Sequence, residues 1–216
     1  MVQQPTTSNQ QPTTNRAMLN NKLEIVLYHP QIPQNTGNIG RLCVNTNIRL
    51  NLIKPLGFSL EEKHIRRSGL DYWQHLNLQV HESWEDFLSS ITSTPIHCSK
   101  SPRENHPKSK HNTSDNKDRS ACNRNSLYFF STKTDRLFWD CPYKTENDDT
   151  TAYLVFGSET GGFSEDIYKE FDNSLYTIPM CGIHSRSYNL SNSVAIVLFE
   201  GFRKLNYGAS FELKSI

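Results

Sequence analysis

Short apolar runs alternate with helix-like segments along most of this 216-residue chain, and no other feature constrains the fold as strongly. Between the runs, apolar residues recur at helical spacing, as at Ile39, Leu42 and Cys43. Alternating strands and helices predict an α/β fold with a mostly parallel sheet and helices on both faces. The predicted strands, rich in aromatic and aliphatic residues, are 23–28, 49–53, 127–131, 153–157 and 175–178.

Polar residues mark where the predicted helices begin. Asn35 is expected to cap the first helix, and Ser164 to cap a helix over 165–171. Ser83 with Asp86 resembles a capping box before another short helix.

Two polar stretches interrupt the pattern and explain why hydrophobic residues make up only 35% of the chain. Residues 3–15 repeat the unit QQPTT, and residues 98–125 carry seven basic and three acidic residues with almost no apolar ones. Such segments bury too little surface to offset the entropy of ordering. We expect a disordered tail over 1–21, one domain over 22–210, and within it a disordered insertion at about 98–125 that adds RNA affinity.

Composition excludes several classes of protein. The net charge of +1 gives no overall attraction to nucleic acid, so an RNA site must be a local patch. No apolar run approaches the roughly 20 residues that span a bilayer, and the start lacks the apolar core of a secretory signal. The five cysteines are odd in number and irregularly spaced, which argues against both a disulfide framework and a usual zinc motif. We therefore expect a cytoplasmic protein with no membrane partner and no metal.

Three loops rich in Gly, Asn and Ser lie at the ends of predicted strands, where the ligands of parallel sheets bind. GSETGG (157–162) is neither a dinucleotide-binding motif nor a Walker loop, but its glycines allow close approach of the backbone to a ligand. SRSYNLSNS (185–193) holds more polar groups than one helix cap needs, and NTGNIGR (35–41) ends in Arg41. From the residues alone, this edge of the sheet is a small-ligand or nucleotide site.

Basic residues outside these loops suit RNA. Lys63, Arg66 and Arg67 lie on a predicted helix just before Tyr72 and Trp73, and basic side chains beside aromatic ones can contact phosphates and unstacked bases. A solvated charged face is the alternative for this cluster, as a solvated helix residue is for Arg41.

Taken together, the motifs resemble the SPOUT superfamily of methyltransferases, and within it the TrmL-type transfer-RNA (cytidine/uridine-34 2′-O)-methyltransferases. The resemblance implies methylation of the ribose 2′-oxygen of the wobble nucleotide 34, a cytidine or modified uridine, with S-adenosylmethionine as cofactor. It also implies a C-terminal trefoil knot and a homodimer. The matching segments are IVLYHPQIPQNTGNIGRLCVNT, KPLGFSLEEKHIRRSGLDYW, LVFGSETGG, IPM and SRSYNLSNSVAIVLFE.

The resemblance also assigns site residues. Arg41, Glu159 and Asn189 match catalytic-motif positions, and Lys63, Arg66 and Arg67 are the expected RNA contacts. A guanidinium keeps its proton in proteins, which favours Arg41 as a clamp on a substrate phosphate and developing oxyanion, with Glu159 and Asn189 ordering the loops. The expected cofactor contacts are Phe130, Gly157, Ile178, Met180 and Ser187.

Two other functions stay open at this point. The same fold could methylate a different RNA ribose, or the chain could be a catalytically silent RNA-binding protein. One departure from the family bears on substrate binding, because Gly161 stands where relatives often carry a basic residue.

Overall fold

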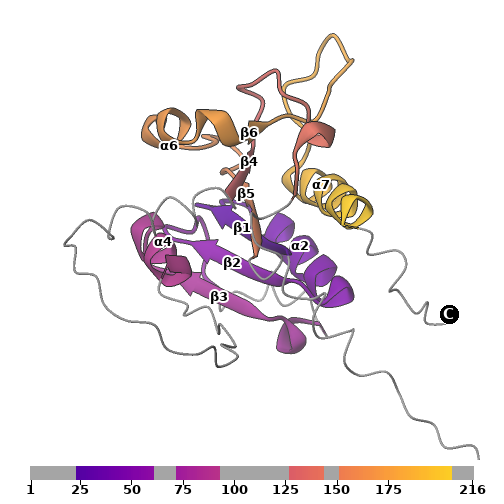
Figure 1. Ribbon diagram of the computed structural model, residues 1–216. Helices are drawn as coiled ribbons and strands as arrows, with labels where there is room; N and C mark the ends of the chain where they lie inside the picture. Colours follow the sequence, from indigo (N-terminus) through magenta and orange to yellow (C-terminus); the bar gives the residue numbers. More distant parts are fainter. Residues whose placement is uncertain (1–22, 61–71, 93–126, 144–150, 206–216) are drawn as a thin grey trace, which may run out of the picture.

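The computed structural model describes residues 23–60, 72–92, 127–143 and 151–205. Within these ranges the chain forms a parallel six-stranded sheet in the order β3-β2-β1-β5-β4-β6 (Figure 1). The strands are β1 (Leu23–Tyr28), β2 (Arg49–Ile53), β3 (Leu78–His81), β4 (Leu127–Phe130), β5 (Ala152–Phe156) and β6 (Leu175–Tyr176). The helices are α2 (Pro33–Thr46), α4 (Trp84–Thr92), α6 (Glu165–Glu170) and α7 (Leu190–Lys204), with single 3₁₀ turns η1 (Trp73–His75), η2 (Phe138–Asp140) and η3 (Asp172–Ser174).

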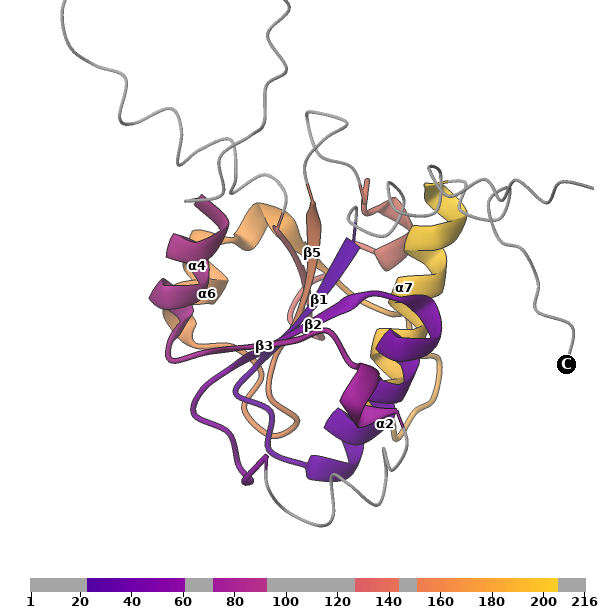
Figure 2. The same cartoon turned by 90° about the horizontal axis from the view of Figure 1, so that it is seen from below.

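The helices cover both faces of the sheet, as the alternating pattern predicts. Helices α2 and α7 lie on one face, and α4 and α6 on the other (Figure 2). Successive strand residues point to opposite faces, so Ile25 and Leu27 pack with α2 and α7 whereas Val26 packs with α4 and α6. Both faces of the central strands are therefore buried, which accounts for their continuous apolar sequence.

Most predicted helix boundaries are confirmed, but the start of α2 is not. The Ser164 hydroxyl accepts a hydrogen bond from the Ile167 amide, and the Ser83 hydroxyl accepts one from the Asp86 amide. The prediction that Asn35 caps α2 is wrong, because the helix already begins at Pro33 and Ile32 holds the cap position without a side-chain bond. Proline suits the first helical position, since its missing N–H has no partner there. The Asn35 side chain therefore bonds residues outside the helix instead of capping it.

A buried polar chain crosses β1, β2 and β3. The Asn51 amide nitrogen donates to the Glu24 carboxylate at 2.9 Å, and its oxygen lies 3.2 Å from the His81 Nε2. Burial raises the pKa of the Glu24 carboxyl, and the hydrogen bond from Asn51 and the charge of Arg49 partly offset this rise. Burial lowers the pKa of the His81 imidazole, and the Asp86 carboxylate partly offsets this decrease. Because the Asn51 oxygen only accepts, neutral His81 carries its proton on Nε2.

Several predictions fall on residues outside the described ranges: the tail over 1–21, the insertion at about 98–125, and the RNA contacts Lys63, Arg66 and Arg67. In the described part, no helix has the length and apolarity to cross a bilayer. The same part contains no group of three or more His, Cys, Asp or Glu side chains placed to hold a metal ion.

Candidate active site

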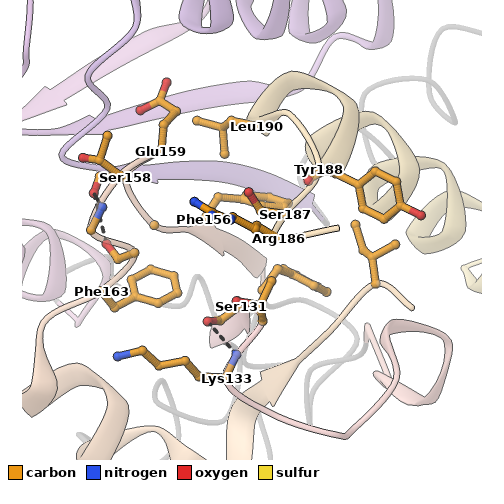
Figure 3. A pocket seen from close by; sticks show the side chains of 18 of the residues that line it. Ser131, Lys133, Phe156, Ser158, Glu159, Phe163, Arg186, Ser187, Tyr188 and Leu190 are labelled. Atoms are coloured by element: carbon orange, nitrogen blue, oxygen red, sulfur yellow. Dashed lines mark hydrogen bonds between the residues drawn. The ribbon is translucent and has the colours of Figure 1, made fainter. Parts of the chain in front are cut away.

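A cavity of about 520 Å³ opens beyond the carboxyl ends of β4, β5 and β6. This is the edge of the sheet at which the loop sequences predict a ligand, and the volume lies within the range of small-molecule and cofactor sites. Its walls come from the segments that follow the three strands and from the residues before α7 (Figure 3). All five expected cofactor contacts line it: Phe130, Gly157, Ile178, Met180 and Ser187.

One wall of the cavity is a tight backbone loop after β5. The amides of Ser158 and Gly162 each donate to the carbonyl of the other at 3.0 Å, which closes residues 158–162 into a narrow turn. Gly157 packs against this turn so closely that a Cβ there would lie 2.6 Å from the Gly162 carbonyl carbon. Gly162 itself has φ +66°, a conformation that favours glycine. Gly157 and Gly162 are therefore required by this local geometry.

Glu159 lines the cavity, and its carboxylate is directed towards the start of α2. Its carboxylate accepts hydrogen bonds from the Gln31 amide at 2.8 Å, the Ile32 amide at 3.2 Å and the Asn35 side chain at 2.9 Å. Helix α2 has no acidic residue in its own first turn, so Glu159 supplies the negative charge that a helix N-terminus favours.

Asn35 extends this contact to α7. It is 4% exposed, and its oxygen accepts a hydrogen bond from the Asn189 amide nitrogen at 2.9 Å. Asn189 caps α7, its oxygen accepting from the Ser191 amide at 2.9 Å. Glu159, Asn35 and Asn189 thus tie the GSETGG loop and two helix starts together, all three lining the cavity. The sequence places Asn35 in a motif but gives no sign of this link, because its partners lie more than a hundred residues away.

A second group of polar residues lies on the cavity wall, at positions outside the residues expected from the sequence to form the site. The Lys133 ammonium lies 4.2 Å from the centre of the Tyr168 ring and 3.2 Å from a Glu165 carboxylate oxygen. The Tyr168 hydroxyl lies 3.1 Å from the Ser131 hydroxyl and accepts from the Phe163 amide at 3.3 Å. Arg186 adds a second positive charge on the wall nearest α7 (Figure 3).

Arg41 is not among the residues that line the cavity. It is exposed on α2, six residues beyond Asn35 and so about 9 Å farther along the helix axis. Its guanidinium carbon lies 5.0 Å from the centre of the Tyr72 ring. The structure thus separates Arg41 from the expected cofactor contacts, whereas Glu159 and Asn189 join them.

Most of the chain is similar in sequence to known RNA methyltransferases. A family model described as the SpoU rRNA Methylase family matches residues 22–199. A tRNA (cytidine(34)-2′-O)-methyltransferase from Methylovorus glucosotrophus (strain SIP3-4) is 36% identical over 188 residues, which are 87% of this chain and 98% of that protein.

Two solved structures show the same fold. One, described as "Structural insights into the 2-OH methylation of C/U34 on tRNA", is similar with a TM-score of 0.64 and 28% identity, covering 87% of this chain and 99% of that one. An AdoMet-bound rRNA methyltransferase from Sinorhizobium meliloti has a TM-score of 0.62 at 16% identity, covering 86% of this chain and 57% of that one. At that identity the second likeness concerns the fold alone.

Proposed function

The chain belongs to the SpoU rRNA methylase family, and from this premise we propose that it methylates the ribose 2′-oxygen of the wobble nucleotide 34 of transfer RNA. The relative that matches almost end to end carries this activity in its name, at 36% identity. The observation that carries the proposal is the cavity at the carboxyl ends of β4, β5 and β6, because the expected cofactor contacts line it together with Glu159 and Asn189.

The residues of this cavity fit S-adenosylmethionine as cofactor. Phe130, Ile178 and Met180 offer apolar contacts to an adenine ring, and the backbone of Gly157 on the cavity wall offers hydrogen-bonding groups to the ring edge. Ser187 adds a hydroxyl on the facing wall. When bound, S-adenosylmethionine supplies a methyl group activated by a positively charged sulfur.

The chain's own residues act mainly by positioning. Glu159, Asn35 and Asn189 join the GSETGG loop to the starts of α2 and α7, and in this proposal they keep the walls of the cofactor site fixed during methyl transfer. Arg41 lies outside the cavity, so we assign it to a phosphate of the RNA backbone rather than to the cofactor. A part for Arg41 in stabilising the developing oxyanion stays a prediction from the family resemblance. No metal has a part in this scheme.

A homodimer is part of the proposal. Residues 181–189, next to the cavity, are all exposed, and Ile183 is 92% exposed. On α7, Phe199 is 57% exposed although the opposite side of the helix is buried in the core. Large exposed apolar side chains are typical of surfaces that bind another protein. The family resemblance implies that this partner is a second copy of the chain. The trefoil knot stays a prediction on the same basis, and a cytoplasmic location stays a prediction from the sequence.

The test is incubation of the purified protein with labelled S-adenosylmethionine and total transfer RNA, followed by nuclease digestion and mass spectrometry of the labelled nucleotide. A 2′-O-methylated nucleotide 34 is expected. Label at another ribose would keep the reaction and overturn the target. An absence of both label and cofactor binding would instead favour a silent RNA-binding protein.

A further inference from the structure

The surroundings of Arg41 are unusual for an exposed basic residue with a proposed role in catalysis. In the described part of the chain, no ion pair or hydrogen bond engages its guanidinium. Its defined contact is the face of Tyr72, whose ring centre lies 5.0 Å from the guanidinium carbon. Tyr72 is 37% exposed, so the pair lies at the surface, where RNA can reach it.

The position of Tyr72 is fixed through the residue next to Arg41. Gly40 is buried, and a Cβ built on it would lie 3.2 Å from both the Trp73 ring and the Leu76 side chain. The missing side chain of Gly40 therefore lets η1 pack directly on α2. Tyr72 immediately precedes η1, and its carbonyl accepts a hydrogen bond from the His75 amide at 2.9 Å, so this packing sets the ring beside Arg41.

The way a guanidinium is held decides what it can still bind. A carboxylate partner would occupy its in-plane N–H groups, which are the groups that bind phosphate in pairs. An aromatic ring attracts the positive charge as a whole and offers no paired oxygen acceptors, so the N–H donors stay available for a phosphate. We propose that Tyr72 is a positioning residue that holds Arg41 over its ring and leaves the guanidinium donors available to a phosphate of the RNA substrate. This inference rests on the proposed function, because it takes the Arg41 target to be transfer RNA.

The test compares Tyr72→Leu with Tyr72→Phe, which keeps the ring and loses only the hydroxyl. Tyr72→Leu is expected to weaken transfer-RNA affinity and to lower kcat/KM about two- to fivefold, the factor expected for an exposed cation–π contact. Tyr72→Phe is expected to restore both quantities to near the wild-type values. Trp139→Leu serves as the matched control, since Trp139 is a similarly exposed aromatic residue (43%) outside the cavity lining. The unfolding midpoint is measured for each variant.

Transfer-RNA affinity is then measured in an Arg41→Ala background, where it can be followed even without methyl transfer. Tyr72→Leu should cause no further loss there, because its effect passes through Arg41. An equal loss with and without Arg41 would overturn the proposal and assign Tyr72 to direct RNA contact. Equal damage by Leu and Phe, or a wild-type-like Tyr72→Leu, would overturn it as well.

Failure of the proposed function gives a different result. In that case the wild-type protein does not methylate nucleotide 34 at all. A wild-type protein that methylates nucleotide 34, together with an unaffected Tyr72→Leu variant, refutes only the role of Tyr72.

Discussion

Replacing Glu159 with Gln is expected to destabilise the start of α2 and weaken cofactor binding, without removing a group from the reaction itself. The carboxylate accepts three hydrogen bonds, from the Gln31 and Ile32 amides and from the Asn35 side chain. A Gln amide has one oxygen to accept with, and its NH₂ group would face donors. The Ile32 amide and the Asn35 side chain donate to the same carboxylate oxygen, so the Gln oxygen can keep both bonds, and the bond from the Gln31 amide to the other oxygen is lost.

The expected loss of stability follows from these contacts. Loss of the Gln31 hydrogen bond costs about 1 kcal/mol, and loss of a negative charge at a helix N-terminus costs about 0.5–1 kcal/mol. The Gln NH₂ group would also face the Gln31 N–H, so we expect a decrease of about 2 kcal/mol in the free energy of unfolding. For a domain of this size, this corresponds to a Tm lower by roughly 4–8 °C.

Thermal unfolding and S-adenosylmethionine titration measure the two effects. The matched control is Glu82→Gln, which removes a carboxylate that is 77% exposed and pairs with Lys54 at 2.7 Å. Such a surface ion pair contributes at most about 1 kcal/mol, so the control should change Tm little. If Glu159→Gln lost methyl transfer while Tm and cofactor affinity stayed at wild-type values, the carboxylate would act on the reacting atoms and our reasoning would be refuted.

Three further predictions follow from the site and the sheet. Gly157→Ala forces a Cβ to within 2.6 Å of the Gly162 backbone, so cofactor affinity measured by calorimetry should fall at least tenfold. In the control Gly161→Ala, the new Cβ lies 3.2 Å from the Ser158 hydroxyl, and the loss of affinity should be much smaller. Equal losses in the two variants would contradict the clash at Gly157. Arg41→Ala should lower methyl transfer at least about a hundredfold in a labelled-methyl assay and leave cofactor affinity within about twofold; a parallel loss of cofactor binding would show that the roles are not separate. Burial lowers the pKa of folded His81 below its ordinary value of 6.5, so the unfolded chain binds the proton first, and stability should fall as pH drops below about 6.5, by at most about 1.4 kcal/mol per pH unit. Denaturant unfolding from pH 7.5 to 5.5 should show a steeper loss for the wild type than for His81→Gln, and identical slopes would exclude a contribution from His81.

The sequence predicts the sheet and the place of the cavity because both follow from local pattern. Continuous apolar runs such as that of β5 indicate strands buried on both faces, and their carboxyl ends indicate where a ligand binds. The motifs also point to Phe130, Gly157 and Asn189, which the structure brings to one cavity.

What the sequence cannot predict are contacts between distant segments. Asn35 has the residue type of a helix cap, yet its side chain links Glu159 to Asn189. Arg41 lies in the same short motif as Asn35, but the turn of the helix carries it out of the cavity and onto Tyr72. In both cases the outcome depends on tertiary packing, which residue type and spacing do not encode.

The central position of β1 has a consequence for the newly made chain on the ribosome. Leu23 pairs with Ala152, so one edge of the first strand stays without its neighbour until β5 has left the exit tunnel. Glu159, which supplies the negative charge at the start of α2, is synthesised after β5, and Asn189, which caps α7, is synthesised later still. Apart from Ile32 and Asn35, every residue that lines the cavity lies at or beyond Phe130. A prematurely terminated product that ends before β5 therefore exposes an apolar strand edge to aggregation and chaperones, and it lacks most of the residues that line the cavity.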